Sequence, residues 1–287
     1  MTVSRASATA LLHSVQRGLS PIELVYVPHD RWPLSRSRLP PQVQRPLQIS
    51  ILDSSFNPPT SSHLALANAP RPSTGDTDGE YDAKIFLLSV RNADKSLKPS
   101  DASYVQRLEM MLLLAQDSIT HDSSEQRVAI AIIDEPIFRL SALQAGVTPL
   151  TPPRPQLTFM LGFDTLERVL SPRYYGASPT DPEAQSKMFS SLHNFFSAEY
   201  DNSRVVCARR ASSLSSEAAT LALAERFLSE KYIVLIDIGE DEQTYSSTAV
   251  RDAIGRRDDH GWKKMVSPGV REYITKQRLY VDPLMVD

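Results

Sequence analysis

Six short apolar segments recur between residues 47 and 238, and they constrain the fold of this chain more than any other feature. Several are nearly continuous apolar runs, as expected for strands that are covered on both faces. Helical patterns or polar loops lie between them. This alternation predicts a single α/β domain with a Rossmann-like, doubly wound parallel sheet. We expect the strands at residues 47–53, 84–90, 128–134, 157–161, 204–208 and 232–238.

Residues 1–46 differ in composition from the rest of the chain. Helical spacing at 7–19 and an apolar run at 22–27 predict a helix and a strand, and 31–46 is rich in Arg and Pro. We therefore divide the chain into an N-terminal extension with its linker, residues 1–46, and a domain spanning 47–287. The first nineteen residues carry Arg and Ser and no acidic residue, so a mitochondrial transit peptide is the alternative interpretation.

Charge and cysteine content narrow the classes of partner and compartment. The 31 basic and 34 acidic residues give a net charge of -3, which offers no bulk reason to expect nucleic acid or a membrane surface as a partner. No apolar run approaches the roughly 20 residues that cross a bilayer. The lone Cys207 sits in an apolar run and is expected to be a core thiol. We expect a soluble protein of the cytoplasm or nucleus. Oligomeric state stays open, a homo-oligomer included.

Ser55 to His63 forms the first candidate site, at a turn between the strand 47–53 and a short helical segment at 64–69. In an open parallel sheet such a turn lies at the carboxyl edge of the strands, where ligands bind. Helix amides at 61–63 would face an anion there, and an imidazole could add a donor. The alternative is a Pro-stiffened loop with a Ser cap and a surface histidine.

Thr244 to Arg251 forms the second candidate site, soon after the last predicted strand. Hydroxyl groups of Ser246, Ser247 and Thr248 can cap helix amides or hold phosphate oxygens. Arg251 lies one turn further on, and its guanidinium can form a bidentate pair of hydrogen bonds with a phosphate. The alternative is an ordinary Ser/Thr cap beside a solvated arginine.

Together these segments resemble the two signatures of the nucleotidyltransferase superfamily, with 55–63 similar to the first and 245–251 similar to the second. Three further pieces resemble nicotinamide mononucleotide adenylyltransferases: 92–97 with Arg107 on the next helix, 162–166, and 266–280. Residues 52–59 look most like a fungal branch of that family, the promoter-of-filamentation proteins.

The resemblance implies transfer of AMP from ATP to nicotinamide mononucleotide, giving NAD and pyrophosphate. It implies Mg²⁺ bridging the ATP phosphates and few protein ligands to metal; no His/Cys cluster suggests zinc. By resemblance, the catalytic residues are His63 and Arg251. ATP would be contacted by Ser55, Phe56, Thr60, Ser246, Ser247 and Thr248, and the acceptor by Asn92, Lys95, Gly162, Asp164 and Tyr175.

This sequence also departs from the family pattern. Ser54 and Ser62 replace two glycines, and the tryptophan that stacks on nicotinamide is missing, so that Tyr174 or Tyr175 would have to stack instead. These departures leave two alternatives open: an ATP-binding or ATP-hydrolysing homologue with a regulatory or partner-binding role, or adenylyl transfer to another phosphorylated acceptor. We expect His63→Ala to abolish turnover and leave the fold intact.

Overall fold

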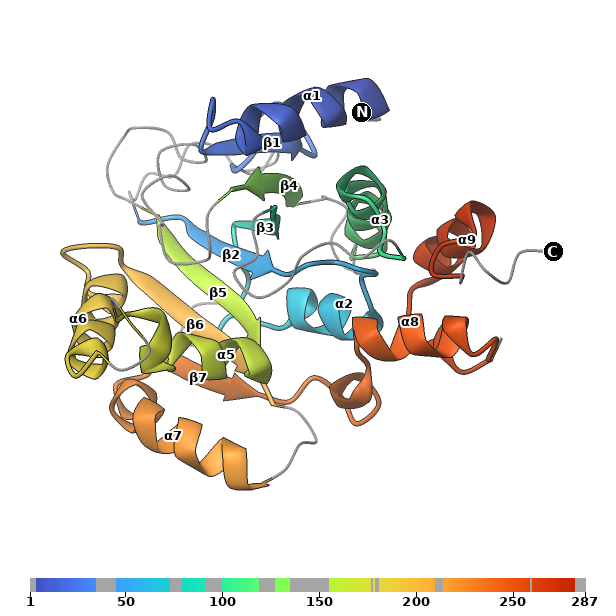
Figure 1. Ribbon diagram of the computed structural model, residues 1–287. Helices are drawn as coiled ribbons and strands as arrows, with labels where there is room; N and C mark the ends of the chain where they lie inside the picture. The colour runs from blue at the N-terminus through green and yellow to red at the C-terminus, as the bar shows by residue number, and fades with distance from the viewer. Residues whose placement is uncertain are drawn as a thin grey trace.

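Seven strands form one sheet in the computed structural model, which describes residues 4–34, 45–72, 79–90, 100–118, 127–134, 155–176, 178, 181–209, 214–258 and 260–281 (Figure 1). The strand order is β1-β4-β3-β2-β5-β6-β7. All neighbouring strands are parallel except β1, which pairs antiparallel with β4 at one edge. The bounds are β1 Ile22–Tyr26, β2 Gln48–Asp53, β3 Ala83–Ser89, β4 Val128–Ile133, β5 Gln156–Gly162, β6 Ser203–Ala208 and β7 Ile233–Ile236.

Helices cover both faces of this sheet, which confirms the predicted doubly wound α/β fold. One face is buried by α5 (Phe163–Val169), α6 (Ala184–Phe196) and α7 (Leu214–Ser229). The other is buried by α1 (Arg5–Gln16), α2 (Ser61–Asn68) and α3 (Tyr104–Asp117). The central strands are apolar on both sides because each side meets a helix layer. None of the described helices has the length and apolar character to span a bilayer.

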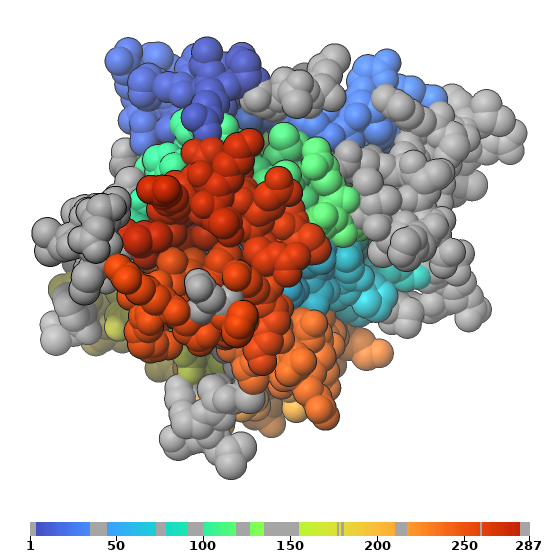
Figure 2. All heavy atoms as spheres, turned by 90° about the vertical axis from the view of Figure 1, so that its right-hand side faces the viewer, coloured from blue at the N-terminus to red at the C-terminus, as the bar shows by residue number. Residues whose placement is uncertain are grey.

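The C-terminal segments form a third, smaller apolar cluster beside α3. This cluster joins α8 (Ser247–Gly255), the 3-10 turn Trp262–Lys264 and α9 (Pro268–Gln277). Met110 and Val270 are fully buried at its centre. In Figure 2 these segments, coloured orange to red, gather over the middle of one face of the molecule. Helix α9 is therefore packed against α3, one of the helices on the face of the sheet that α1, α2 and α3 cover.

The helix and strand predicted in the N-terminal extension are present. Three residues of α1 are buried against the sheet, namely Ala8, Leu12 and Val15, and β1 adds an edge strand to it. The domain boundary predicted after residue 46 stays a prediction. Cys207 is fully buried in β6, and burial raises the pKa of its thiol to about 12. It is a core residue, as predicted.

Candidate functional site

The sheet has a topological switch point between β2 and β5, its two central strands. From β2 the chain moves outward to β3 and β4, and from β5 it moves the other way to β6 and β7. In open α/β sheets, ligands bind in the crevice outside the carboxyl ends of the strands at such a point. The turn at 54–63 follows β2, and Gly162 ends β5. The first predicted site segment and Gly162 are therefore at the place where open α/β sheets bind ligands.

His63 lies in the first turn of α2, and both of its ring nitrogens are engaged. The backbone N–H of Thr60 donates to Nδ1 at 3.0 Å, and the Thr60 hydroxyl lies 2.8 Å from the same atom. Nε2 lies 2.9 Å from the hydroxyl oxygen of Ser54. The ring also packs on Phe56, with centroids 5.3 Å apart. His63 thus fixes the shape of the turn as well as lining it, so removing its side chain will affect stability.

The amides at the start of α2 are arranged differently from the prediction. The Ser61 N–H donates to the carbonyl of Met265 at 2.8 Å, and the His63 N–H to the carbonyl of Thr60 at 3.0 Å. The segment before α9 covers this helix end, a contact that no local sequence pattern indicates. An anion at the turn would therefore be held by side chains and by residues 54–56 rather than by these two amides.

Phe56 and Ser55 form the bend between β2 and the rest of the turn. The Phe56 side chain is fully buried, and its φ of 44° places the backbone in the left-handed region. What Phe56 can offer a ligand is therefore its backbone. The Ser55 carbonyl accepts a hydrogen bond from Arg107 at 3.3 Å.

Asn57 joins three distant parts of the chain, a role that was not predicted. Its side-chain N–H donates to Asp101 at 2.7 Å, and its side-chain oxygen accepts from the Ala102 N–H at 3.2 Å and the Tyr280 hydroxyl at 3.0 Å. The Asn57 side chain is buried, so these bonds replace the water that it loses. The position of Asn57 inside the first motif was the only sequence signal for this network.

The second segment contacts the first directly. The Ser247 hydroxyl donates to the Pro58 carbonyl at 2.7 Å, and the Arg251 guanidinium donates to the Asn57 carbonyl at 2.5 Å. Ser246 caps α8 by accepting from the Ala249 N–H at 3.1 Å, and the Thr248 hydroxyl accepts from Arg251 at 3.3 Å. Residues about 190 positions apart in sequence thus form one cluster, as the two motifs require.

Two guanidinium groups share one carboxylate in this cluster. Asp101 lies 3.8 Å from Arg107 and 3.8 Å from Arg251. Burial lowers the pKa of Arg107, but an arginine keeps its charge at neutral pH. The three side chains therefore carry a net positive charge. Arg251 is 25% exposed and Arg107 only 7%, so a ligand reaches Arg251 first.

The two serines that replace glycines play different parts. The Ser62 hydroxyl lies 2.6 Å from the Glu242 carbonyl and 3.1 Å from the Tyr245 carbonyl, so it ties α2 to the segment before α8. Ser54 instead contacts His63, and its backbone N–H donates to Leu87 at 3.3 Å. Ser62 is therefore used for packing between segments, and Ser54 alone lies beside the imidazole.

Asp53 precedes this turn at the end of β2. Within the part of the chain that the structure describes, its carboxylate has no hydrogen-bond or ion-pair partner. Burial raises the pKa of Asp53 to about 7. A carboxylate without a partner in such a position lowers the stability of the folded state when it is charged. Groups of this kind are often found at functional sites.

Of the residues predicted to contact the acceptor, Gly162 ends β5, Asp164 lies in α5, and Tyr175 follows the 3-10 turn after α5. Gly162 caps α5, and a Cβ added there would meet no atom within 4 Å, so there is open space beside it. Asp164 lies exposed in the first turn of α5 and is not its cap. The Tyr175 hydroxyl donates to the Val169 carbonyl at 2.8 Å, and its ring packs against the core. Asn92 and Lys95 lie outside the described residues.

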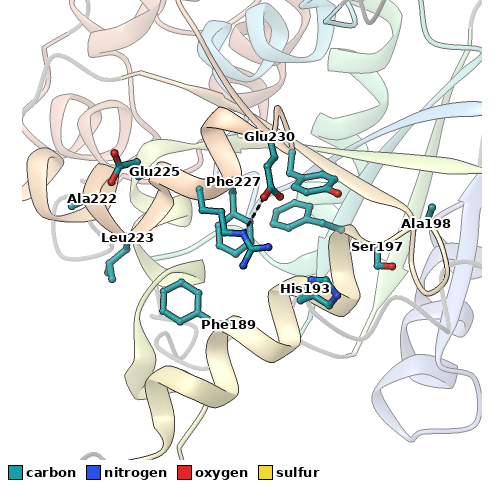
Figure 3. A pocket seen from close by; sticks show the side chains of 12 residues that line it. Phe189, His193, Ser197, Ala198, Ala222, Leu223, Glu225, Phe227 and Glu230 are labelled. Carbon is teal, nitrogen blue, oxygen red and sulfur yellow. Dashed lines mark hydrogen bonds and ion pairs between the residues drawn. The ribbon is translucent and has the colours of Figure 1, made fainter.

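A separate groove of about 450 Å³ lies between α6 and α7, where Figure 3 shows Phe189 and His193 on one helix facing Phe227 on the other. Arg226 and Glu230 form an ion pair at 3.0 Å beside it. None of the predicted site residues lines this groove. In the described ranges no three His, Cys, Asp or Glu side chains come together as a metal site.

Comparison with known proteins gives two informative matches, and no family model matches the chain. A Schizosaccharomyces pombe protein described as a putative nicotinamide mononucleotide adenylyltransferase is 31% identical over 163 residues, which are 56% of this chain and 53% of the relative. The chain therefore matches about half the length of that relative. A solved nicotinic acid mononucleotide adenylyltransferase of Plasmodium falciparum, complexed with APC, aligns with a TM-score of 0.51 at 14% identity, covering 82% of this chain and 97% of that one. This second match concerns the fold.

Proposed function

We propose that this protein is a nucleotidyltransferase of the pyridine mononucleotide adenylyltransferase family. It transfers AMP from Mg-ATP to nicotinamide mononucleotide or nicotinate mononucleotide and releases pyrophosphate. The observation that carries the proposal is the contact between the two motif segments at the switch point, through Ser247 to Pro58 and Arg251 to Asn57. The named S. pombe relative supports the same reaction. The fungal branch within the family is part of the proposal and rests on residues 52–59.

The residues present suit this chemistry. The attacking group is a phosphate oxygen of the mononucleotide, which is ionised at neutral pH and needs no strong general base. Its bond to the α-phosphorus forms as the bond from that phosphorus to the bridging oxygen breaks, and pyrophosphate leaves. The protein therefore has to position two phosphates and stabilise negative charge.

Positive charge and hydrogen-bond donors lie at the turn where they are needed. Arg251, with Arg107 behind it, gives the cluster its net positive charge, and we assign Arg251 to the departing phosphates. The hydrogen-bonded pair of Ser54 and His63 lies on the β2 side, where we place the α-phosphate. Magnesium enters with ATP as part of the substrate and neutralises phosphate charge; few protein ligands are required for that.

On the other strand of the switch point, Gly162 leaves open space at the end of β5. We place the acceptor on this side, with Asp164 as a further contact; Asn92 and Lys95 stay contacts that only the resemblance predicts. Nicotinamide and nicotinate differ by an amide and a carboxylate, so the identity of the acceptor is a question for direct measurement. The missing tryptophan makes that comparison necessary.

The test is a product assay with both acceptors. Purified protein is incubated with Mg-ATP and either nicotinamide or nicotinate mononucleotide, and the dinucleotide and pyrophosphate are quantified. The proposal predicts equal amounts of both products with at least one acceptor. Inorganic phosphate and ADP, formed without any dinucleotide, would contradict it and support the ATP-hydrolysing alternative. Phosphopantetheine serves as a third acceptor and tests the alternative of adenylyl transfer to another phosphorylated acceptor.

A further inference from the structure

The tautomer of His63 follows from its surroundings. A backbone N–H can only donate, so Nδ1, which faces the Thr60 N–H at 3.0 Å, must hold a lone pair. The neutral ring then carries its proton on Nε2. Since Nε2 lies 2.9 Å from the Ser54 oxygen, this N–H donates to the serine hydroxyl.

The hydroxyl of Ser54 is thereby left with a hydrogen to give. Within the described residues it has no carbonyl or carboxylate acceptor. Its backbone is held by the bond from its N–H to the Leu87 carbonyl, and its side chain is only half-buried. The last donor that this turn presents to an incoming anion is therefore a hydroxyl and not the imidazole.

We propose that Ser54 donates the hydrogen bond to the α-phosphate of ATP, and that His63 is a positioning residue that orients and polarises the Ser54 hydroxyl. This inference rests on the proposed function for the identity of the anion. A hydroxyl that accepts from an N–H becomes a better donor, because hydrogen bonds in a chain polarise one another. Ser54 keeps its proton throughout, since the interaction is a hydrogen bond and no proton is transferred.

This arrangement explains how a serine is tolerated where the related sequences have glycine. A serine that only filled space would take room from the phosphate. A serine that accepts from His63 and donates onward inserts one hydroxyl between the ring and the ligand. The competing interpretation is that the hydrogen bond between Ser54 and His63 must break before His63 can bind ATP. The two interpretations predict opposite effects of removing the hydroxyl.

The experiment measures kcat and KM for ATP in Ser54→Ala, Ser54→Thr, His63→Gln and the double variant Ser54→Ala with His63→Gln. Gln at position 63 can still accept from the Thr60 N–H, which preserves the cap. We expect Ser54→Ala to lower kcat about 10- to 100-fold and to raise the KM for ATP up to about 10-fold. The kcat of Ser54→Thr should stay within about 5-fold of wild type. The kcat of the double variant should lie within about 3-fold of that of the slower single variant, because the two residues act as a unit. Ser62→Ala is the matched control.

An unchanged or increased kcat in Ser54→Ala would overturn the inference, and so would fully multiplicative losses in the double variant. Thermal unfolding of each variant checks that the fold is kept. If no dinucleotide forms, measurements of nucleotide affinity test this inference separately from the proposed function. The ratio of the adenosine Kd to the ATP Kd, measured by calorimetry, should fall about 10-fold in Ser54→Ala. An unchanged ratio overturns the inference, and a wild-type protein that binds ATP no tighter than adenosine contradicts both.

Discussion

The turn at 54–63 and the segment at 242–251 form one cluster, yet they are built in different ways. The first turn is shaped from within: His63 accepts from Thr60, and Phe56 is buried beneath the ring. In the second segment, the Ser247 and Arg251 side chains donate hydrogen bonds to backbone carbonyls of the first turn. The first turn therefore presents donors to a ligand, and the second holds that turn in place and supplies charge. Substitutions in the two segments should differ accordingly.

Arg251→Gln should have the largest effect. It removes the positive charge that a ligand reaches first and one bond to the Asn57 carbonyl, so we expect kcat/KM to fall at least about 100-fold. Steady-state kinetics of dinucleotide formation measure this. Arg256→Gln, at an exposed position at the end of the same helix, is the matched control. Equal losses in both variants would mean that bulk charge, and not this contact, is responsible.

Asp53→Asn should stabilise the protein, in a pH-dependent manner. The folded-state pKa is about 7 against 3.8 in the unfolded chain, so the folded state retains a proton that the unfolded state has released. The Asp53 contribution to wild-type stability therefore becomes less favourable as pH rises from about 4 to about 7 and changes no further above that. The variant lacks this loss and should gain about 1–3 kcal/mol at pH 8 relative to wild type.

Urea unfolding at pH 5 and pH 8 checks this prediction. The stability difference between Asp53→Asn and wild type should be smaller at pH 5 than at pH 8. A difference that is the same at both values would show that Asp53 is not a destabilising buried charge. A gain in stability with a loss of nucleotide affinity would show that stability is exchanged for function at the first turn.

Gly162→Ala should weaken ligand binding without affecting the fold. The added methyl meets no protein atom within 4 Å, so the melting temperature should stay within about 2 °C of wild type. If a ligand fills the space beside β5, the methyl will reduce its affinity about 10-fold. Calorimetric titration with ATP and with the mononucleotide identifies which ligand is affected. An unaltered affinity for both ligands would place the site elsewhere.

Ser62→Ala should have the smallest effect. It loses the contacts to the Glu242 and Tyr245 carbonyls, which join the two segments, and should cost about 0.5–1.5 kcal/mol of stability. Its kcat should match wild type, because the hydroxyl does not face the ligand. Chemical denaturation together with the product assay measures both quantities. A large fall in kcat would remove the distinction between the two serines.

Most of the fold was predictable from local pattern. The strand expected at 157–161 is present as β5. Its mostly apolar run is buried, and the strand ends at Gly162. A helical pattern runs from Gln185 to Tyr200 in the sequence, but α6 ends at Phe196, where Ser197 turns to an extended conformation. The antiparallel pairing of β1 with β4 was not predictable, because partner choice at a sheet edge depends on residues a hundred positions apart.

The candidate site was predictable as two motifs but not as a network. The resemblance brought 55–63 and 245–251 together, and the structure places them in contact. The links from Asn57 to Asp101 and Tyr280 depend on long-range packing, which leaves no local signal. The same holds for the Met265 carbonyl, which takes the Ser61 amide.

In the proposed reaction, this cluster directs attack on the α-phosphorus of ATP. The most direct test uses ATP labelled at the α-phosphate together with the preferred mononucleotide. We expect the label to appear in the dinucleotide, with one pyrophosphate released per labelled product. Label that remains in ADP, with free phosphate released from the γ-position, would contradict the account.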